Sequence, residues 1–377
     1  MIPFNKPLTT GQEAGHLQNV MSSSHLSGNG PYTKKCQILL QERYKFKKVF
    51  LTTSCTDALE MSAILIDVKQ GDEIIVPSYT FVSTALAFVR QGAKIVFADS
   101  QKSNPNIDAD KIEGLISSKT KAIVVVHYAG VACEMDKIMD IARKYNLYVV
   151  EDSAQSIDSY YKDIPLGSIG NLGVISFHET KNIQCGEGGC LIINDEKFLK
   201  RAEIIWEKGT NRADFYRGEI NKYGWVDIGS SFLPSELNAA FLFGQLEMID
   251  EIQNKRISLW NYYYNGLKEL GEEGYIYIQG LPKFTTNNGH MFYIICRSEN
   301  ERQHLINHLK KYEIQSVFHY QSLHKSLYYQ NQHDGRELLM SDFYTNRLLR
   351  LPMYFSLEKT DIDKIVSTIK NFYKYEL

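Results

Sequence analysis

A lysine that follows an apolar run is the first candidate for chemistry in this sequence. The run Gly173-Val174-Ile175-Ser176-Phe177 suits a buried strand, and Lys181 comes shortly after it among small and polar residues. Burial lowers the pKa of a lysine and makes its amine a nucleophile able to form a Schiff base. The alternative is an ordinary surface lysine just past a strand, which is the commoner fate of this residue type.

Two carboxylates end another apolar run. Glu151 and Asp152 follow Leu147-Tyr148-Val149-Val150, and Gln155 comes three residues later. A buried carboxylate stays ionised only when it is paired, and a protonated ring nitrogen is one suitable partner. A helix cap made by Asp152 is an equally good interpretation of the same residues.

A third segment, Thr53-Ser54-Cys55-Thr56, lies between a predicted strand and a predicted helix. Backbone N–H groups and hydroxyls at a helix N-terminus form an anion site, which the helix dipole strengthens. Taken alone, the segment favours a plain N-cap, because Ser and Thr are the usual caps.

Metal ligation is not expected. His304 and His308 are four residues apart on a predicted helix, but residue 305 is Leu, so the zinc-protease pattern is absent. Cys185 and Cys190 lack a second pair for zinc. The sequence therefore predicts no metal site.

A basic group farther along the chain has two interpretations of equal weight. Lys208, Arg212 and Arg217 lie within ten residues of one another. Arginine forks suit phosphate oxygens, so these residues are candidates for holding a diphosphate. A solvated loop explains them equally well.

The elements that must position these residues alternate between strand and helix, which indicates a mostly parallel, doubly wound α/β sheet. The predicted strands are 49–52, 73–76, 94–97, 122–126 and 147–150, and the intervening helices include 56–68, 82–90 and 135–145. In such sheets ligands bind beyond the carboxyl ends of the strands, where all three candidate segments fall.

Two domains are expected. Residues 1–250 form a large α/β domain and residues 251–377 a smaller α+β domain, and the first ~20 residues are expected to pack on the smaller one. The first thirty residues are expected to be rich in loops. From Ser235 a long helical pattern is predicted, with one apolar stripe formed by Leu237, Ala240, Phe241, Gly244, Met248 and Ile252.

Composition excludes several classes. The 377 residues carry 42 Lys and Arg against 44 Asp and Glu, a net charge of -2, so no basic field attracts nucleic acid or a membrane surface. No segment is apolar enough to span a bilayer, and the N-terminus lacks the features of a signal peptide. Six cysteines are too few for a disulfide scaffold, so a cytoplasmic location is expected.

Five spaced motifs together are specific. TSCTDAL at 53–59, PSYTFVST at 77–84, EDSAQS at 151–156, SFHETKN at 176–182 and GEGG at 186–189 resemble the DegT/DnrJ/StrS family of sugar aminotransferases, in the expected order and over essentially the whole chain. The resemblance implies the fold type I aminotransferase architecture and pyridoxal 5'-phosphate (PLP) as cofactor.

The resemblance implies roles for the candidate catalytic residues. Lys181 would carry the cofactor as a Schiff base and then shuttle a proton. Asp152 would keep the pyridine nitrogen protonated, and Gln155 would contact the phenolic oxygen of the ring. His178 would line the sugar site.

Other positions would hold the cofactor. Phe81 stands where the family stacks an aromatic ring on the cofactor face, and Cys55, Thr56 and Ser176 would hold its phosphate. Many members have an Asn that reaches the phosphate of the neighbouring subunit, where this chain has Ser231. The resemblance therefore implies a homodimer with shared active sites, with that one contact changed.

Further motifs narrow the expected reaction. IPFN at 2–5, VHYAGVACEMD at 126–136 and EKGTNR at 207–212 resemble the branch that makes dTDP-4-amino-4,6-dideoxy-D-galactose for cell-surface polysaccharides such as enterobacterial common antigen or O-antigen. The implied substrates are L-glutamate and dTDP-4-dehydro-6-deoxy-D-glucose, with Lys208, Arg212, His319 and Tyr320 on the substrate side.

Three alternatives remain. A different nucleotide sugar or C4 epimer is the first. A PLP-type sugar dehydratase is disfavoured by Lys181, because those enzymes replace the lysine. A non-catalytic regulator is the third, and the presence of Asp152, Gln155 and Lys181 gives no reason to prefer it.

Overall fold

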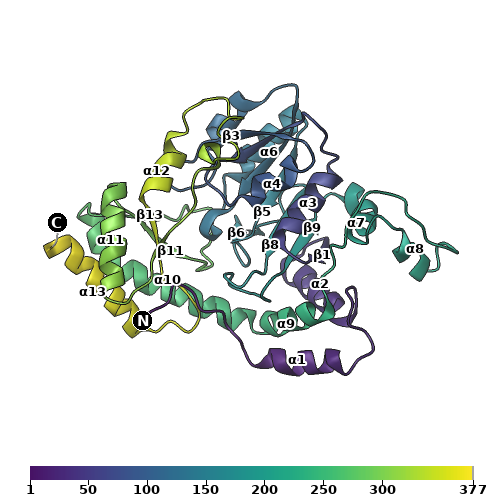
Figure 1. Ribbon diagram of the computed structural model, residues 1–377, viewed down its shortest axis with the longest axis horizontal. Coiled ribbons are helices and arrows are strands. Elements are labelled where there is room, and N and C mark those ends of the chain that lie inside the picture. The colour runs from purple at the N-terminus through teal and green to yellow at the C-terminus, as the bar shows by residue number, and fades with distance from the viewer. Residues whose placement is uncertain (376–377) are drawn as a thin grey trace.

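The computed structural model describes residues 1–375 and contains a large seven-stranded sheet (Figure 1). The strand order is β1-β9-β8-β5-β4-β2-β3, and only β9 runs antiparallel to its neighbours among these seven strands. The expectation of a mostly parallel α/β sheet is confirmed. The strands are β1 (Lys48–Thr52), β2 (Glu73–Pro77), β3 (Lys94–Ala98), β4 (Thr120–Val126), β5 (Tyr148–Asp152), β8 (Leu172–Ser176) and β9 (Gly189–Ile193).

Helices cover this sheet because its central strands are apolar on both faces. Every residue from Ala122 to Val126 is buried, as a parallel strand between two helix layers requires. The helices of this part are α2 (Pro31–Tyr44), α3 (Cys55–Leu65), α4 (Ser83–Val89), α5 (Ala109–Ile112), α6 (Met135–Tyr145), α7 (Leu199–Trp206) and α8 (Arg212–Tyr216). Short hairpin strands β6 (Tyr160–Tyr161) and β7 (Ile164–Pro165) follow β5.

A second, antiparallel sheet has the order β10-β11-β13-β12. Its strands are β10 (Tyr277–Ile278), β11 (Phe292–Ile295), β12 (Val317–Phe318) and β13 (Leu348–Leu351). Helices α11 (Glu299–Lys311) and α13 (Lys359–Tyr375) lie beside it in Figure 1, and α12 (Leu339–Arg347) leads directly into β13.

The long helical pattern after Ser235 is two helices, α9 (Glu236–Glu247) and α10 (Ile249–Glu272). The predicted stripe is wrong in part, because Leu237 is exposed while Ala239 and Leu242 are buried. Ile249 and Ile252 pack in the core beside α9, whereas the later part of α10 packs in the core of the second sheet. The helix therefore connects the two cores, and the domain division at residue 250 stays a prediction.

The N-terminal segment differs from the loop that its composition suggested. Helix α1 (Gln12–Met21) lies along α9, as Figure 1 shows at the bottom of the molecule. The first residues pack elsewhere: Ile2 pairs with Ile314 and is buried in the core of the second sheet. Apolar residues are sparse in α1, which is why its periodicity was weak.

The carboxyl ends of β1, β2, β4, β5 and β8 meet at one edge of the large sheet, because these strands run in the same direction. Loops that follow them carry the candidate residues, as the general rule for open α/β sheets predicts. Among residues 1–375, no helix is long and apolar enough to cross a membrane.

Candidate active site

A cavity of about 630 Å³ lies at this edge and takes residues from both sheets. Such a volume is typical of small-molecule sites. The large sheet and its loops contribute the candidate lysine, the candidate carboxylate and the α3 N-terminus. The second sheet and its loops add His319 and Tyr320, which were predicted on the substrate side, and His290 and Arg350, which were not predicted. The lining of the cavity includes Ser54, Cys55, Thr56, Phe81, Asp152, Gln155, Ser176, His178, Lys181, His290, His319, Tyr320 and Arg350.

Lys181 faces the cavity from the loop after β8 and is not a solvated surface lysine. Burial lowers its pKa, and the nearby Asp152 carboxylate opposes that shift. The next residue fixes the loop: Asn182 Nδ2 donates 2.8 Å hydrogen bonds to Gln253 Oε1 and to the Asn288 carbonyl, and its Oδ1 accepts from His290 Nδ1 at 2.9 Å. A buried polar network therefore holds the loop, and burial favours the neutral, nucleophilic form of the Lys181 amine.

Asp152 is buried at the end of β5, and no helix begins there in the described chain, so it does not act as a helix cap. Thr84 Oγ1 donates to its Oδ2 at 2.7 Å and the Ala154 N–H to its Oδ1 at 3.1 Å. Burial raises the pKa of the carboxyl, and these two hydrogen bonds oppose the rise without supplying a cation. The charges of Lys181 and His127 also oppose the rise, but no ion pair to Asp152 forms among the described residues, so the carboxylate suits a ligand that brings an N–H cation.

Gln155 joins the Asp152 loop to the second sheet. Its Oε1 accepts the Ala129 N–H at 2.6 Å, and its Nε2 donates to the Tyr320 hydroxyl at 2.9 Å. An amide has two N–H groups, so one donor remains for a ligand. Tyr320 also lies near Phe81, with ring centroids 6.2 Å apart.

The N-terminus of α3 opens into the cavity. Ser54 is its N-cap, accepting the Asp57 N–H at 3.1 Å, so the capping interpretation is correct for that residue. Cys55 and Thr56 line the cavity at the positive end of the helix dipole. A Cβ at Gly189 would lie 2.5 Å from the Cys55 amide nitrogen, which explains a glycine where β9 passes this turn.

Three further predicted residues line the same cavity. Ser176 is buried at the end of β8, while Phe81 is 55% exposed. His178 Nδ1 lies 3.0 Å from Thr180 Oγ1, and its Nε2 lies 3.6 Å from a Glu187 oxygen. His178 and Phe81 therefore lie on the open side of the cavity, where a larger substrate would contact them.

His319 and Tyr320 form the wall contributed by the second sheet. Their rings stack with centroids 3.6 Å apart, and His319 Nδ1 lies 2.6 Å from the Tyr128 hydroxyl. The Tyr79 hydroxyl donates to the His319 carbonyl. Burial holds the pKa of His319 well below its ordinary value, so the ring is neutral at neutral pH.

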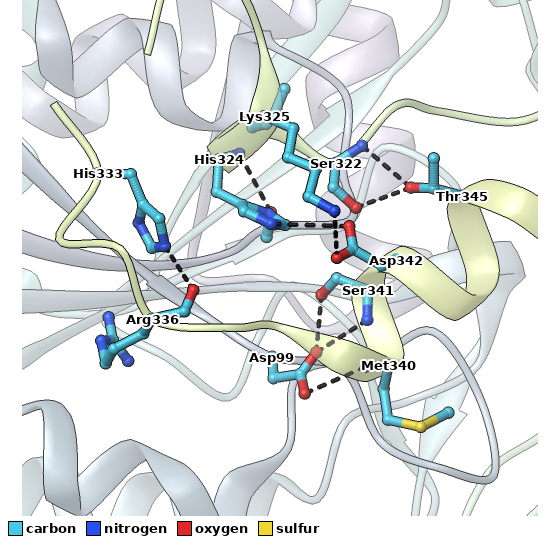
Figure 2. A network of polar contacts seen from close by, with 12 residues as sticks. Asp99, Ser322, His324, Lys325, His333, Arg336, Met340, Ser341, Asp342 and Thr345 are labelled. Atoms are coloured by element: carbon cyan, nitrogen blue, oxygen red, sulfur yellow. Dashed lines mark hydrogen bonds and ion pairs between the residues drawn. The ribbon is translucent and has the colours of Figure 1, made fainter. Parts of the chain in front are cut away.

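A polar network docks the segment that delivers this wall onto the large sheet (Figure 2). Asp99, just after β3, accepts the Ser341 N–H at 2.8 Å, the Ser341 hydroxyl at 3.0 Å and the Met340 N–H at 3.3 Å. His324 Nδ1 lies 2.7 Å from Ser78 Oγ, and its other nitrogen faces Asp342. The network fixes α12 and therefore the start of β13.

Sequence reasoning missed His290 and Arg350. Both lie in the second sheet or just before it, far along the chain from Lys181, and only the packing of the two sheets brings them to the cavity. One signal existed: Arg350 interrupts the apolar run Leu348-Leu349-Arg350-Leu351, where a charge needs a reason to be tolerated.

Ser231, Lys208 and Arg212 are brought together, but in a second hollow that shares no lining residue with the Lys181 cavity. Arg212 Nε lies 3.2 Å from a Glu207 carboxylate oxygen. Within one chain these residues do not meet Lys181, so the contact of Ser231 with a neighbouring subunit's cofactor and the substrate-side roles of Lys208 and Arg212 stay predictions. The described residues contain no cluster able to hold a metal ion.

Comparisons with known proteins agree with this arrangement. Residues 7–370 match the model of the DegT/DnrJ/EryC1/StrS aminotransferase family. The spore coat polysaccharide biosynthesis protein SpsC of Bacillus subtilis is 30% identical, over 99% of this chain and 97% of its own.

Solved structures share the whole architecture. The aminotransferase TlmJ of Streptoalloteichus hindustanus is 25% identical, with a TM-score of 0.92 over 100% of both chains. Spr1654 of Streptococcus pneumoniae, solved in forms with pyridoxamine phosphate (PMP) and with PLP, is also 25% identical, and its PMP form has a TM-score of 0.92 over 100% of both chains. The chain therefore belongs to the DegT/DnrJ/EryC1/StrS family and is a PLP-dependent sugar aminotransferase.

Proposed function

We propose that this enzyme transfers the amino group of L-glutamate to the C4 ketone of dTDP-4-dehydro-6-deoxy-D-glucose, giving dTDP-4-amino-4,6-dideoxy-D-galactose. One observation supports amino transfer above all: a lysine of lowered pKa and a buried carboxylate that forms no ion pair among the described residues face one cavity. The substrate pair rests on the motifs at 2–5, 126–136 and 207–212.

The residues present fit PLP. The buried Asp152 carboxylate has room for one more N–H donor, Gln155 has an unused amide N–H, and the α3 N-terminus at Cys55 and Thr56 suits a phosphate. Ser176 and Phe81 complete the set, against the phosphate and the ring face. When bound, the cofactor supplies an electron sink for the carbon that gains or loses the amino group.

The chain's own groups then do the proton chemistry. Asp152 holds a proton on the ring nitrogen, which a neutral side chain would not do. Lys181 Nζ would take a proton from the donor carbon and deliver one to the sugar carbon. His319, kept neutral by burial, and His178 at the open side border the space that the sugar would fill.

We propose a homodimer in which Ser231, Lys208 and Arg212 serve the partner's site. Support comes from the exposed segment around α8, which presents an unusual number of apolar side chains to solvent. These are Phe215, Tyr216, Tyr223, Trp225, Val226 and Ile228. Light scattering that finds a fully active monomer would contradict this assembly.

A substrate panel tests the proposed reaction. The enzyme is incubated with L-glutamate and the dTDP, UDP or GDP form of the 4-keto-6-deoxy sugar, and the product C4 configuration is assigned from proton couplings. We expect turnover of the dTDP sugar to the galacto product. Preference for another nucleotide or the gluco product would replace the substrate assignment and leave the aminotransferase class intact.

The proposed product is used for cell-surface polysaccharides, and the relative SpsC is likewise a polysaccharide biosynthesis protein.

A further inference from the structure

One cation in the cavity has no acidic partner. Arg350 on β13 lines the cavity, and its Nε is buried without a hydrogen-bond partner. Its guanidinium carbon lies 4.6 Å from the centre of the Phe4 ring. Buried charges are normally paired, because moving a charged group out of water without a counter-ion costs free energy.

No ion pair to Arg350 forms among the described residues, and its nearest electrostatic partners are hydroxyl groups. Burial lowers the pKa of Arg350, and the groups that oppose the shift are the hydroxyls of Tyr128, Tyr320 and Tyr79, with no carboxylate among them. Tyr79 and Tyr128 are buried and Tyr320 is half-buried, and burial raises the pKa values of all three, so they stay neutral at neutral pH. Arg350 therefore offers the cavity a positive charge that an anionic ligand can balance.

We propose that Arg350 binds the α-carboxylate of the amino-acid donor, with Phe4 stacked on the guanidinium. This inference rests on the proposed amino transfer and assigns the donor subsite within it. A guanidinium fork matches a carboxylate bidentately, and an aromatic face holds its plane.

The position of Arg350 distinguishes the donor carboxylate from the two other anionic groups of the reaction, the cofactor phosphate and the sugar diphosphate. The cofactor phosphate is assigned to the α3 N-terminus on the large sheet, whereas Arg350 belongs to the second sheet. Arg350 and Lys181 line the same cavity, and the charge on Arg350 contributes to the lowered pKa of Lys181.

The covalent structures of the substrates lead to the same assignment. In an α-amino acid, the carboxylate is attached to the same carbon as the amine that must reach Lys181. In a nucleotide sugar, the diphosphate is attached to C1, across the ring from C4. An anion that lies near the amino-transfer position is therefore the donor's carboxylate rather than the sugar's diphosphate.

Phe4 is held in place by the N-terminal segment. Its N–H donates to Gln315 Oε1 at 3.1 Å, and its carbonyl accepts the Met353 N–H at 3.4 Å. Asn5 Nδ2 reaches the Glu179 carbonyl, two residues from Lys181, at 3.5 Å. The segment thus runs from Arg350 toward the Lys181 loop and shields the guanidinium from solvent on one side.

The test separates the two halves of the reaction. Arg350→Gln is compared with Arg347→Gln, a matched control in which an arginine three residues earlier also lies over an aromatic ring, Phe343, outside the cavity lining. In single-turnover mixing of the PLP form with L-glutamate, we expect the apparent dissociation constant to rise about 10- to 100-fold in Arg350→Gln. Arg347→Gln should match the wild type.

Two further readouts make the assignment specific. Calorimetric titration of the PMP form with 2-oxoglutarate should lose binding in Arg350→Gln, and the wild type should discriminate L-glutamate from its α-amide while the variant does not. Cofactor affinity and the single-turnover step from PMP to the keto sugar should stay within about threefold. Arg350→Lys, which keeps the charge without the fork, should be intermediate and serves if Arg350→Gln does not fold.

The contrary outcomes are distinct. Unchanged L-glutamate kinetics in Arg350→Gln overturn the inference and leave the proposed function standing. Loss of cofactor affinity would assign Arg350 to the cofactor phosphate, and a defect confined to the sugar step would assign it to the sugar nucleotide; both overturn it. A wild-type enzyme that reacts with no amino acid refutes the proposed function, and the inference falls with it.

Discussion

Replacing Asp152 with Asn separates two effects of the buried carboxylate: the loss of folding stability that its charge causes, and the contribution of that charge to cofactor binding. An Asn side chain keeps an oxygen for the Ala154 N–H, and the Thr84 hydroxyl can turn to accept from the new amide, so both hydrogen bonds survive in a side chain of nearly the same shape. The variant therefore changes the charge and little else.

The effect on stability follows from the direction of the pKa shift. Burial raises the pKa of Asp152 above its ordinary value of 3.8, so the folded apoprotein binds its proton more tightly than the unfolded chain. Stability contributed by this group therefore falls as pH rises from 3.8 through the raised pKa. The Asn side chain of Asp152→Asn does not titrate, so the variant does not lose this stability as pH rises. Without cofactor, it should be at least as stable as the wild type at pH 7–8.

The effect on cofactor binding has the opposite sign. Losing a charge-assisted hydrogen bond to the protonated ring nitrogen costs about 1.5–3 kcal/mol, which weakens PLP binding by about 10- to 100-fold. Thermal unfolding of the cofactor-free proteins and a PLP titration measure the two effects separately. A variant that is destabilised without cofactor and binds PLP as tightly as the wild type would refute the reasoning.

Two other predictions concern stability. Asp99→Asn should destabilise the docking of α12 by about 1.5–3 kcal/mol. Backbone N–H donors lower the pKa of Asp99 despite its burial, so the greater stability of the wild type should vanish as pH falls through that pKa. Urea unfolding at several pH values measures this difference. Ser54→Ala removes the α3 N-cap and should cost about 1 kcal/mol in the same assay, whereas an unchanged midpoint would show that the cap is dispensable.

The large sheet and most of its site could be predicted because the information is local. Apolar runs locate the strands, and the residues just after them, including Asp152 and Lys181, must meet at one edge once the strands are parallel. The helix of residues 135–145 was equally clear, because one face is apolar and the other charged.

The parts of the fold and of the site that the sequence could not predict depend on contacts between segments far apart in the chain. Nothing near Arg350 in the sequence reveals that β13 lies against the cofactor cavity, or that Phe4 covers its guanidinium. Helix α1 was missed because α9 stabilises it and its own pattern does not. Ser231 was expected at a shared site, and one chain alone leaves it in a separate hollow.

Absorbance of the bound cofactor after mixing with L-glutamate tests the central claim, that Lys181 carries the amino transfer. The wild-type protein should lose the visible band of PLP and gain the near-ultraviolet band of PMP within one turnover. Lys181→Ala should bind PLP and show no such conversion on that time scale, since no other lysine among the described residues lines the cavity. Conversion by Lys181→Ala at the wild-type rate, or an unchanged band in the wild type, would contradict the account.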